Sequence, residues 1–481
     1  MDIWIQGGLL ITPEGSRRAE LGIRDGRIDK VIDATGKAAG EIIDESGEDA
    51  AEVIDARGQW ILPGIIDVHT HMELPVRGTV SADDFSSGTQ AAACGGVTTI
   101  IDFSLHRQGA SLTECFRERR GSADGRVAVD YGLHAEIIDP GERVLEEIPA
   151  LIEEGVTSFK LYLAYGRDGR MVDDGQLFAV LRRCGQCGAL VMVHAENGPL
   201  ADRLTDELIA RGQAGPEGHP LGRPDFTEQE AIGRAVAINR FAGGFLYIVH
   251  VSTRGSVDIL RDAHDRNEKV WAETCPHYLL LDEDVYGRPD GIQYLATPPL
   301  RTSDDQEALW GGLAGGDLSV VSTDHCPFTR RQKLERGDRF DRVPSGLPGV
   351  ETSLCLIHSQ GVVPGRLDPG RMVAAMSANP ARIFGLYPQK GCLREGSQAD
   401  VVIFDPEKEF VLSAENLHMR TDFSPYQGWS GRGAVTMTLL RGKIIVREGR
   451  YCGSAGDGSY LGRAAFDSGQ APPRRPAQAG G

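Results

Sequence analysis

The stretch "ILPGIIDVH", residues 61–69, is an apolar, β-branched run that ends in a histidine. Runs of this type recur downstream as "VTTIIDF" (97–103), "VAVDYGLHA" (127–135), "VTSFKLYL" (156–163), "ALVMVHA" (189–195), "GFLYIVHV" (244–251), "KVWAETC" (269–275) and "LSVVSTD" (318–324). Longer amphipathic segments such as "GERVLEEIPALIEEG" separate them. Eight alternating strand and helix units predict an α/β protein with a (β/α)8 TIM barrel. A doubly wound open sheet is the alternative.

The two ends of the chain show short strand-like runs and turns in place of long helices. Residues 1–58 and 392–452 contain, for example, "AELGIRDGRIDKVI" and "QADVVIFDPEKEFVL". Neither end alone is long enough to close a stable sheet, so together they predict one small β-sandwich domain formed from both termini. The barrel is then expected at residues 59–391. Residues 453–481, rich in Gly, Ala and Pro, are expected to form a flexible tail.

The composition is that of a folded globular chain, with 41% hydrophobic and 25% charged residues among 481. The formal net charge of −18 argues against nucleic acid and anionic membranes as partners. No apolar run is long enough for a membrane span, and "MDIWIQGGLLITPEG" at the N-terminus lacks the regions of a signal peptide. The cysteines are scattered and odd in number, nine in all, which favours reduced thiols and a cytoplasmic protein.

Chemically active side chains stand on several predicted strands, mostly at their ends. The first strand ends with His69 and, just beyond it, His71, and other strands contribute Lys160, His194, His250 and Asp324. In a barrel the carboxyl ends of the strands meet at one rim, where catalytic groups collect. Two histidines two residues apart in a strand point the same way and can share one ion. Imidazole and carboxylate donors favour zinc, with manganese, cobalt or iron as alternatives.

Lys160 needs a separate explanation, because the alternation in "TSFKLYL" turns its side chain toward the barrel axis. A buried ammonium is costly unless it is paired or neutralised, and it would repel a cation. Four imidazoles and one carboxylate carry too little negative charge for two divalent ions. A bridging anion, such as a lysine carbamate, would complete such a site. An ordinary salt bridge inside the barrel is the alternative.

With these residues in place, the chain resembles the cyclic amidohydrolases of the amidohydrolase superfamily, most closely the hydantoinase and dihydropyrimidinase group. The resemblance runs from about residue 1 to residue 450 and rests on specific motifs. They are "GIIDVHTHMELP", "GTVSADDFSSGTQAAACGGVTTIIDF", "TSFKLYLAY", "HAEN", "VHVST", "ETCPHYL", "PPLR", "STDHCPF" and "GLPGVET". The fold of this family is a barrel with a β-sandwich built from both termini, in agreement with the prediction above.

The resemblance implies two divalent metal ions in each subunit, most commonly zinc. It assigns His69, His71 and Asp324 to one ion, His194 and His250 to the other, and a carboxylated Lys160 as the bridge between them. A hydroxide held between the ions would attack the carbonyl of a small cyclic amide. Asp324 would accept the proton of this nucleophile and pass it to the departing ring nitrogen.

The resemblance also implies substrate contacts. Tyr165, five residues after Lys160, matches the family tyrosine that donates to the developing oxyanion. Thr297 and Ser345 stand where related enzymes hold the amide edge of the ring through backbone groups, and where serine and asparagine are common, so the preferred ring stays open. An exocyclic substituent is expected beside residues 72–78 and 162–169. A homotetramer or dimer is expected because relatives are commonly tetramers.

Glu73 distinguishes between members of the superfamily. Dihydroorotase-like sequences carry an arginine at this position that pairs with a substrate carboxylate, so Glu73 is expected to repel such a group. A hydantoin or 5,6-dihydropyrimidine ring, opened to an N-carbamoyl amino acid, is therefore expected. An allantoinase or another cyclic-imide hydrolase is the alternative. A non-catalytic scaffold of dihydropyrimidinase-like fold is disfavoured, since every ligand position is filled.

Overall fold

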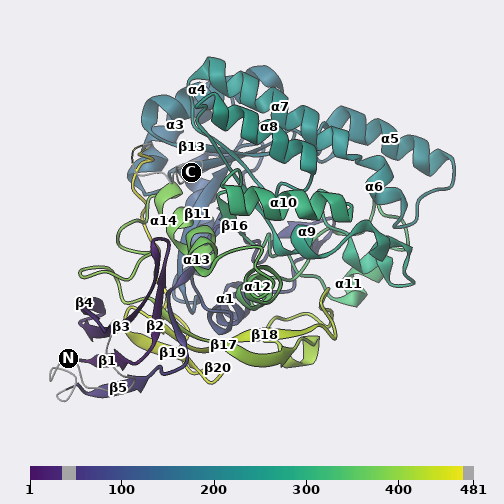
Figure 1. Ribbon diagram of the computed structural model, residues 1–481. Helices are drawn as coiled ribbons and strands as arrows, with labels where there is room; N and C mark the ends of the chain where they lie inside the picture. Colours follow the sequence, from purple (N-terminus) through teal and green to yellow (C-terminus); the bar gives the residue numbers. More distant parts are fainter. Residues whose placement is uncertain (35–49, 468, 470–481) are drawn as a thin grey trace.

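The computed structural model describes residues 1–34, 50–467 and 469, which form a barrel with a mixed sheet packed against it (Figure 1). Eight parallel strands lie side by side in the order β16-β15-β14-β13-β12-β11-β10-β7. They are β7 (Ile65–Asp67), β10 (Val97–Ser104), β11 (Asp130–Glu136), β12 (Ser158–Tyr162), β13 (Leu190–His194), β14 (Leu246–Ile248), β15 (Val270–Thr274) and β16 (Val320–Val321). This spatial order follows the order in the chain, so the predicted TIM barrel is confirmed.

Helices connect the strands and surround the barrel (Figure 1). They are α1 (Phe85–Cys94), α2 (Leu112–Ala123), α3 (Glu142–Glu153), α4 (Asp174–Cys187), α5 (Gly198–Ala210), α6 (Gly218–Gly222), α7 (Asp225–Ala242), α8 (Arg254–Asp265), α9 (Pro276–Leu280), α10 (Ser303–Gly315), α11 (Arg330–Leu334), α12 (Ser353–Ile357), α13 (Pro369–Val373) and α14 (Asn379–Ile383). Helix α3 shows why they pack: Val144, Ile148 and Leu151 are buried at helical spacing. None of the helices in the described residues is long and apolar enough to cross a membrane.

The second unit is a ten-stranded mixed sheet built from both ends of the chain, seen as purple and yellow strands in Figure 1. Its strands are β1 (Ile3–Gln6), β2 (Leu9–Thr12), β3 (Gly15–Arg24), β4 (Arg27–Asp33), β5 (Glu52–Asp55), β6 (Trp60–Pro63), β17 (Val401–Val411), β18 (Ser430–Leu440), β19 (Lys443–Arg447) and β20 (Arg450–Tyr451). A separate pair, β8 (Pro75–Val76) and β9 (Thr79–Val80), forms a small hairpin. The expected β-domain from both termini is therefore present.

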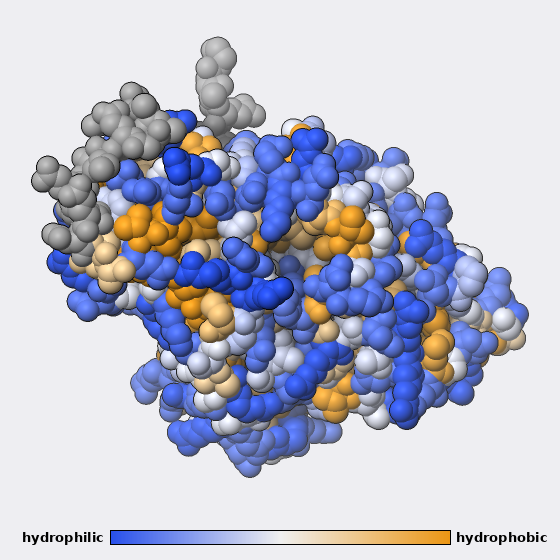
Figure 2. Space-filling view, turned by 90° about the horizontal axis from the view of Figure 1, so that it is seen from below, coloured by the Kyte–Doolittle hydropathy of each residue, from blue (hydrophilic) through white to orange (hydrophobic). Residues whose placement is uncertain are grey.

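Seen from below, the molecular surface is mostly hydrophilic, with separate hydrophobic patches (Figure 2).

The run at residues 61–69, expected to be one strand, is divided between the two units. Strand β6 pairs with β17 in the mixed sheet, whereas β7 belongs to the barrel. Gly64 separates them, and a Cβ at this position would lie 2.0 Å from the hydroxyl oxygen of Thr98. Only glycine fits where the chain passes so close to β10, so the barrel begins after Gly64.

Residues 453–467 pack against the barrel rather than forming the start of a flexible tail. The ring of Phe466 lies 4.8 Å from that of Phe245 and 4.9 Å from that of Trp271, measured between ring centres. Arg463 is buried and donates hydrogen bonds to the hydroxyl of Ser158 and the carbonyl of Leu133. These contacts close the end of the barrel where the strands begin. Residues 468 and 470–481 lie outside the described residues.

The barrel closes through the residues that follow β7 and β16. The His325 N–H donates to the carbonyl of His69 at 3.3 Å, and the His71 N–H donates to the carbonyl of His325 at 2.9 Å. The Asp67 carboxylate accepts from the backbone N–H and the hydroxyl of Thr323 at 3.1 and 2.5 Å. Burial raises the pKa of Asp67 to about 6, although these hydrogen bonds oppose the shift. The closure therefore holds residues 69–71 against residues 323–325.

Candidate metal centre and active site

Every residue predicted for the site lines one cavity of about 290 Å³ at the carboxyl ends of the barrel strands. These residues are His69, His71, Lys160, Tyr165, His194, His250, Thr297, Asp324 and Ser345. They come from loops and strand ends far apart in the chain, and the barrel geometry brings them together at one rim. The cavity is therefore the candidate site for both metal binding and chemistry.

His69, His71 and Asp324 form a compact group in which one ligand atom from each lies within 4.8 Å of the others. The Nε2 atoms of His69 and His71 lie 3.3 and 3.0 Å from the same Asp324 oxygen. Burial opposes ionisation of Asp324, but His69, His71 and the more distant His250 outweigh it and hold the pKa of this carboxyl well below its usual range. Asp324 therefore stays a carboxylate beside two imidazoles.

This donor set fits a divalent cation. The Glu273 carboxylate can only accept, so the hydrogen bond of 2.5 Å between it and His69 Nδ1 places the His69 proton on that nitrogen. His69 Nε2 is the nitrogen that faces the Asp324 oxygen, at 3.3 Å. Histidine with aspartate is a common zinc ligand set, and these two atoms are close enough to bind one ion.

His194 and His250 form a second facing pair, with His194 Nδ1 3.0 Å from His250 Nε2. His194 Nε2 contacts the Glu196 carboxylate at 2.7 Å, and Arg223 donates to the same carboxylate oxygen at 2.6 Å. His194 Nδ1 therefore carries a lone pair that points toward His250. Burial lowers the pKa of both imidazoles, which keeps them in the neutral form that binds metals.

Lys160 lies on β12 with its side chain in the cavity and is 1% exposed. Its Nζ lies 5.3 Å from the ring centre of Tyr162 and 5.6 Å from that of Phe103. Among the described residues, no carboxylate lies within ion-pair distance of this amine. Burial lowers the pKa of Lys160 to about 8, and the more distant carboxylates of Glu273 and Asp324 act in the opposite direction. The salt bridge considered as an alternative is therefore not formed.

Three of the predicted site residues have left-handed backbone conformations that side chains other than glycine rarely adopt. The φ angles are 40° at His250, 48° at Asp324 and 65° at Tyr165. Each such residue typically costs roughly 1–3 kcal/mol, and such strain clusters at functional sites. The conformations turn these side chains into the cavity at the points where strands end, a feature that strand patterns do not predict.

Tyr165, Thr297 and Ser345 lie at the side of the cavity that opens outward. The Tyr165 ring centre is 4.8 Å from that of His194, and burial raises the pKa of its phenol, which keeps it protonated as a donor. Thr297 and Ser345 are half-buried and line the same opening. All three residues line the cavity, and their contacts with a substrate stay a prediction.

Glu273, which holds His69 in place, was not singled out from the sequence. It is fully buried on β15 and also accepts from the Tyr247 hydroxyl at 2.8 Å and from the backbone N–H of His250 at 3.3 Å. A charged residue in the middle of the run "KVWAETC", directly after apolar Trp271 and Ala272, is the signal that could have indicated it. Such outer carboxylates orient ligand histidines and raise their basicity.

The expectation that Glu73 repels a substrate carboxylate is wrong. The Glu73 side chain forms an ion pair of 2.6 Å with Arg126 and lines no part of the cavity, because its φ of 48° turns the loop. From the same loop, Arg77 lines the cavity instead. The charge that this loop presents to a substrate is therefore positive.

Comparisons with known proteins identify the family. A profile of the amidohydrolase family matches residues 60–445. A D-hydantoinase of Streptomyces coelicolor is 44% identical over 96% of this chain and 97% of its own, and one of Ralstonia pickettii is 42% identical over 97% and 100%. The crystal structure of a dihydropyrimidinase from Brevibacillus agri superposes with a TM-score of 0.92 at 39% identity, over 97% of this chain and 100% of that one.

These matches span nearly the whole chain, and the resemblance noted in the sequence is confirmed. With the barrel, the sheet from both termini and the cavity in hand, the chain belongs to the hydantoinase and dihydropyrimidinase group of the amidohydrolase family and is a cyclic amidohydrolase.

Proposed function

We propose that the chain is a two-metal hydrolase that opens a hydantoin or 5,6-dihydropyrimidine ring to an N-carbamoyl amino acid. The observation that carries the proposal is the convergence of the histidines, Lys160 and Asp324 on one cavity of about 290 Å³. This volume is close to the lower end for small-molecule sites, as a small ring requires. Relatives named D-hydantoinase and dihydropyrimidinase support this class of ring.

The residues present fit two divalent cations, with zinc proposed first. One would be held by His69, His71 and Asp324, the other by His194 and His250, and Lys160 as a carbamate would bridge them. When bound, such ions polarise a carbonyl and lower the pKa of water.

The side chains of the cavity supply the proton transfers and the hydrogen bonds. Asp324 accepts a proton as the oxygen of water bonds to the ring carbonyl carbon, and returns it to the ring nitrogen as the C–N bond breaks. The phenol of Tyr165 donates to the carbonyl oxygen as negative charge develops there. Backbone groups at Thr297 and Ser345 hold the amide edge of the ring.

A substrate panel tests the ring class. Purified, zinc-loaded enzyme is assayed with hydantoin, 5-substituted hydantoins, dihydrouracil, allantoin and dihydroorotate, and the N-carbamoyl product is identified by mass spectrometry. Opening of a hydantoin or of dihydrouracil is expected. Fast turnover of allantoin or dihydroorotate alone would overturn the proposal.

Metal analysis tests the bridge. Wild type is expected to hold about two metal ions per chain, as two-metal sites do, and Lys160→Ala to lose metal and activity together. Lys333→Met is the matched control, since Lys333 is equally buried but donates to the carbonyls of Gln293 and Leu295 outside the cavity. Retention of both metals in Lys160→Ala refutes the bridging role.

The proposal includes a homotetramer or dimer, by likeness to the family. Multi-angle light scattering of the purified protein measures the molar mass directly. A monomer at micromolar concentration refutes this part of the proposal and leaves the chemistry untouched.

A further inference from the structure

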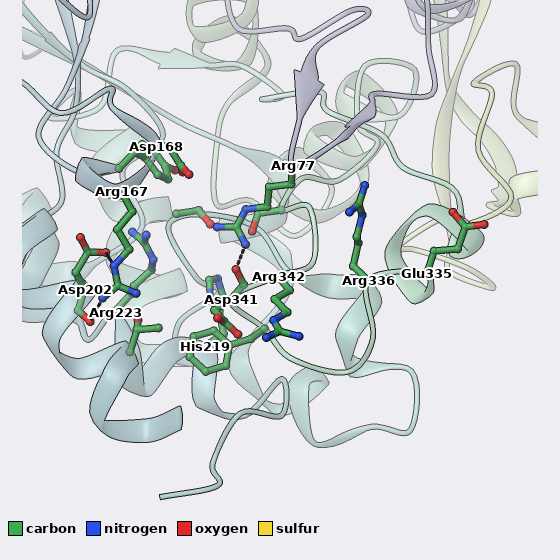
Figure 3. A pocket seen from close by; sticks show the side chains of 15 residues that line it. Arg77, Arg167, Asp168, Asp202, His219, Arg223, Glu335, Arg336, Asp341 and Arg342 are labelled. Atoms are coloured by element: carbon green, nitrogen blue, oxygen red, sulfur yellow. Dashed lines mark hydrogen bonds and ion pairs between the residues drawn. The ribbon is translucent and has the colours of Figure 1, made fainter. Parts of the chain in front are cut away.

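A second cavity of about 560 Å³, whose lining is drawn in Figure 3, adjoins the first. The two cavities share Arg77, Tyr165, Asp168, Thr297 and Ser345 in their walls. A substituent that projects from a ring in the inner cavity would therefore enter this outer cavity. Its lining decides which substituents are accepted.

The outer cavity is lined mainly by charged side chains, labelled in Figure 3. Most of them are neutralised by ion pairs: Arg167 with Asp202, Arg223 with Glu196, Asp341 with Arg339 and Glu335 with Arg331. Among the described residues, Arg77, Arg336 and Arg342 have no carboxylate partner. Asp168 is a carboxylate of the lining that has no ion-pair partner among the described residues. The outer cavity therefore has a surplus of positive charge in a protein whose net charge is −18.

Arg77 is the cation best placed to contact a substrate, because it lines both cavities. The side chain is half-buried, and its Nη1 donates to the carbonyls of Asp341 and Val343. The hydrogen bond to Asp341, drawn in Figure 3, orients the guanidinium. Its Nε and Nη2 groups have no acceptor among the described residues. A guanidinium fixed on one side with free donors on the other suits a carboxylate.

The apolar part of the lining lies on the inner side of Arg77. The inner cavity is lined by the apolar side chains of Leu74, Val76 and Leu105. Among the described residues that line the outer cavity, Phe340 alone has a side chain made only of carbon and hydrogen. A short methylene chain would find apolar contacts near the ring, and its end would meet charged groups. A large apolar substituent such as a phenyl ring would lie against polar side chains in the outer cavity.

We infer that this chain selects cyclic amides whose exocyclic substituent is a short chain ending in a carboxylate, and that Arg77 binds this carboxylate. The inference rests on the proposed ring-opening function and adds the substrate class. Asp168 opposes it by repulsion, but Asp168 is exposed in the turn at residues 166–169, where solvent screens its charge. Arg77 is half-buried and screened less.

The test compares substituents of matched size on one ring. The kcat/KM is measured for 5-carboxyethylhydantoin, its neutral isostere 5-carbamoylethylhydantoin, 5-aminopropylhydantoin and unsubstituted hydantoin. Wild type is expected to prefer the carboxylate over the amide by about tenfold or more, as a charge-assisted pair to arginine provides. Arg77→Gln should bring this ratio close to one, and Arg77→Lys should restore part of it.

Two further variants keep the test decisive. Asp168→Asn, at an exposed position that folding tolerates, should raise the ratio by removing the repelling charge. Arg117→Gln is the control, since Arg117 is 68% exposed on α2 and lines neither cavity, and it should keep the wild-type ratio. A wild-type ratio near one, a preference for the aminopropyl compound, or a ratio unchanged in both Arg77→Gln and Asp168→Asn overturns the inference. If unsubstituted hydantoin or dihydrouracil is opened in those cases, the ring-opening proposal stands; if neither ring is opened, both fail.

Discussion

Replacing Glu273 is expected to weaken metal binding at the site although this residue is not a proposed ligand. Its carboxylate is fully buried and accepts from His69 Nδ1 at 2.5 Å, from the backbone N–H of His250 at 3.3 Å and from the Tyr247 hydroxyl at 2.8 Å. One side chain therefore contacts a member of each histidine pair. Glutamine and alanine disturb this arrangement in different ways, so the two variants separate charge from orientation.

The structure sets the size of each effect. His69 and His250 contact Oε1 and the Tyr247 hydroxyl contacts Oε2, so glutamine can keep all three hydrogen bonds, with its amide donating to the hydroxyl. Only the charge that raises the basicity of His69 is lost. Alanine also leaves the His69 Nδ1–H without an acceptor. Loss of such a partner costs about 10- to 100-fold in metal affinity, or about 1.4 to 2.7 kcal/mol, and we expect glutamine at the lower end and alanine at the upper.

Chelator competition measures the metal dissociation constants, and kcat/KM is determined on the same preparations. Tyr247→Phe is the control, because it removes one donor to the Glu273 carboxylate and leaves the contact with His69 intact. Its metal affinity should stay close to that of wild type. The reasoning is refuted if Glu273→Ala binds metal as tightly as wild type, or if glutamine is as damaging as alanine.

Three further predictions concern stability. Phe466→Ala should lower the free energy of unfolding by about 3–5 kcal/mol in denaturant titrations, because its buried ring packs on Trp271 at the far end of the barrel, and unchanged stability would contradict that packing. The Cys94 thiol and the Glu351 carboxylate raise the pKa of His418 above 6.5, to about 10. Protonated His418 therefore stabilises the folded state fully below pH 6.5, and this contribution is lost as the pH rises through 10. His418→Gln should accordingly lower the Tm more at acidic than at strongly alkaline pH. An equal loss of Tm at both would argue against the interaction of His418 with Cys94 and Glu351. Removal of metal by a chelator should lower the Tm and abolish activity. Zinc added at 1,000 times its Kd should restore about 4 kcal/mol of the free energy of unfolding. An unchanged Tm after metal removal would speak against a bound metal.

The repeating pattern of strands and helices predicted the barrel, but it did not show where the first barrel strand begins. The run at residues 61–69 is apolar throughout, and strands buried on both faces carry no alternation that would reveal a break. Gly64 marks the division only once the approach of Thr98 is known. The packing of Phe466 was missed for a similar reason, since it depends on the apolar end of the barrel and not on the composition of residues 453–481.

The predicted ligand positions lie together because strand order and rim geometry follow from the pattern alone. The direction of loop side chains does not. The φ angles are 48° at Glu73 and 46° at Arg77, and in this loop Glu73 pairs with Arg126, whereas Arg77, for which no role was predicted, lines the cavity. Glu273 could have been suspected, because a carboxylate in a buried strand requires donors, but its partners come from other strands.

Strand β6 lies between β2 and β17 in the mixed sheet and leads through Gly64 into the first strand of the barrel. During synthesis, β6 and β2 emerge long before β17, which begins at Val401. Until then β6 has an unpaired edge, and an unpaired strand edge is a site at which another chain can pair. The loop that carries His69 and His71 thus gains its final anchor only when translation is nearly complete, and metal loading is expected to be a late step in the life of the chain.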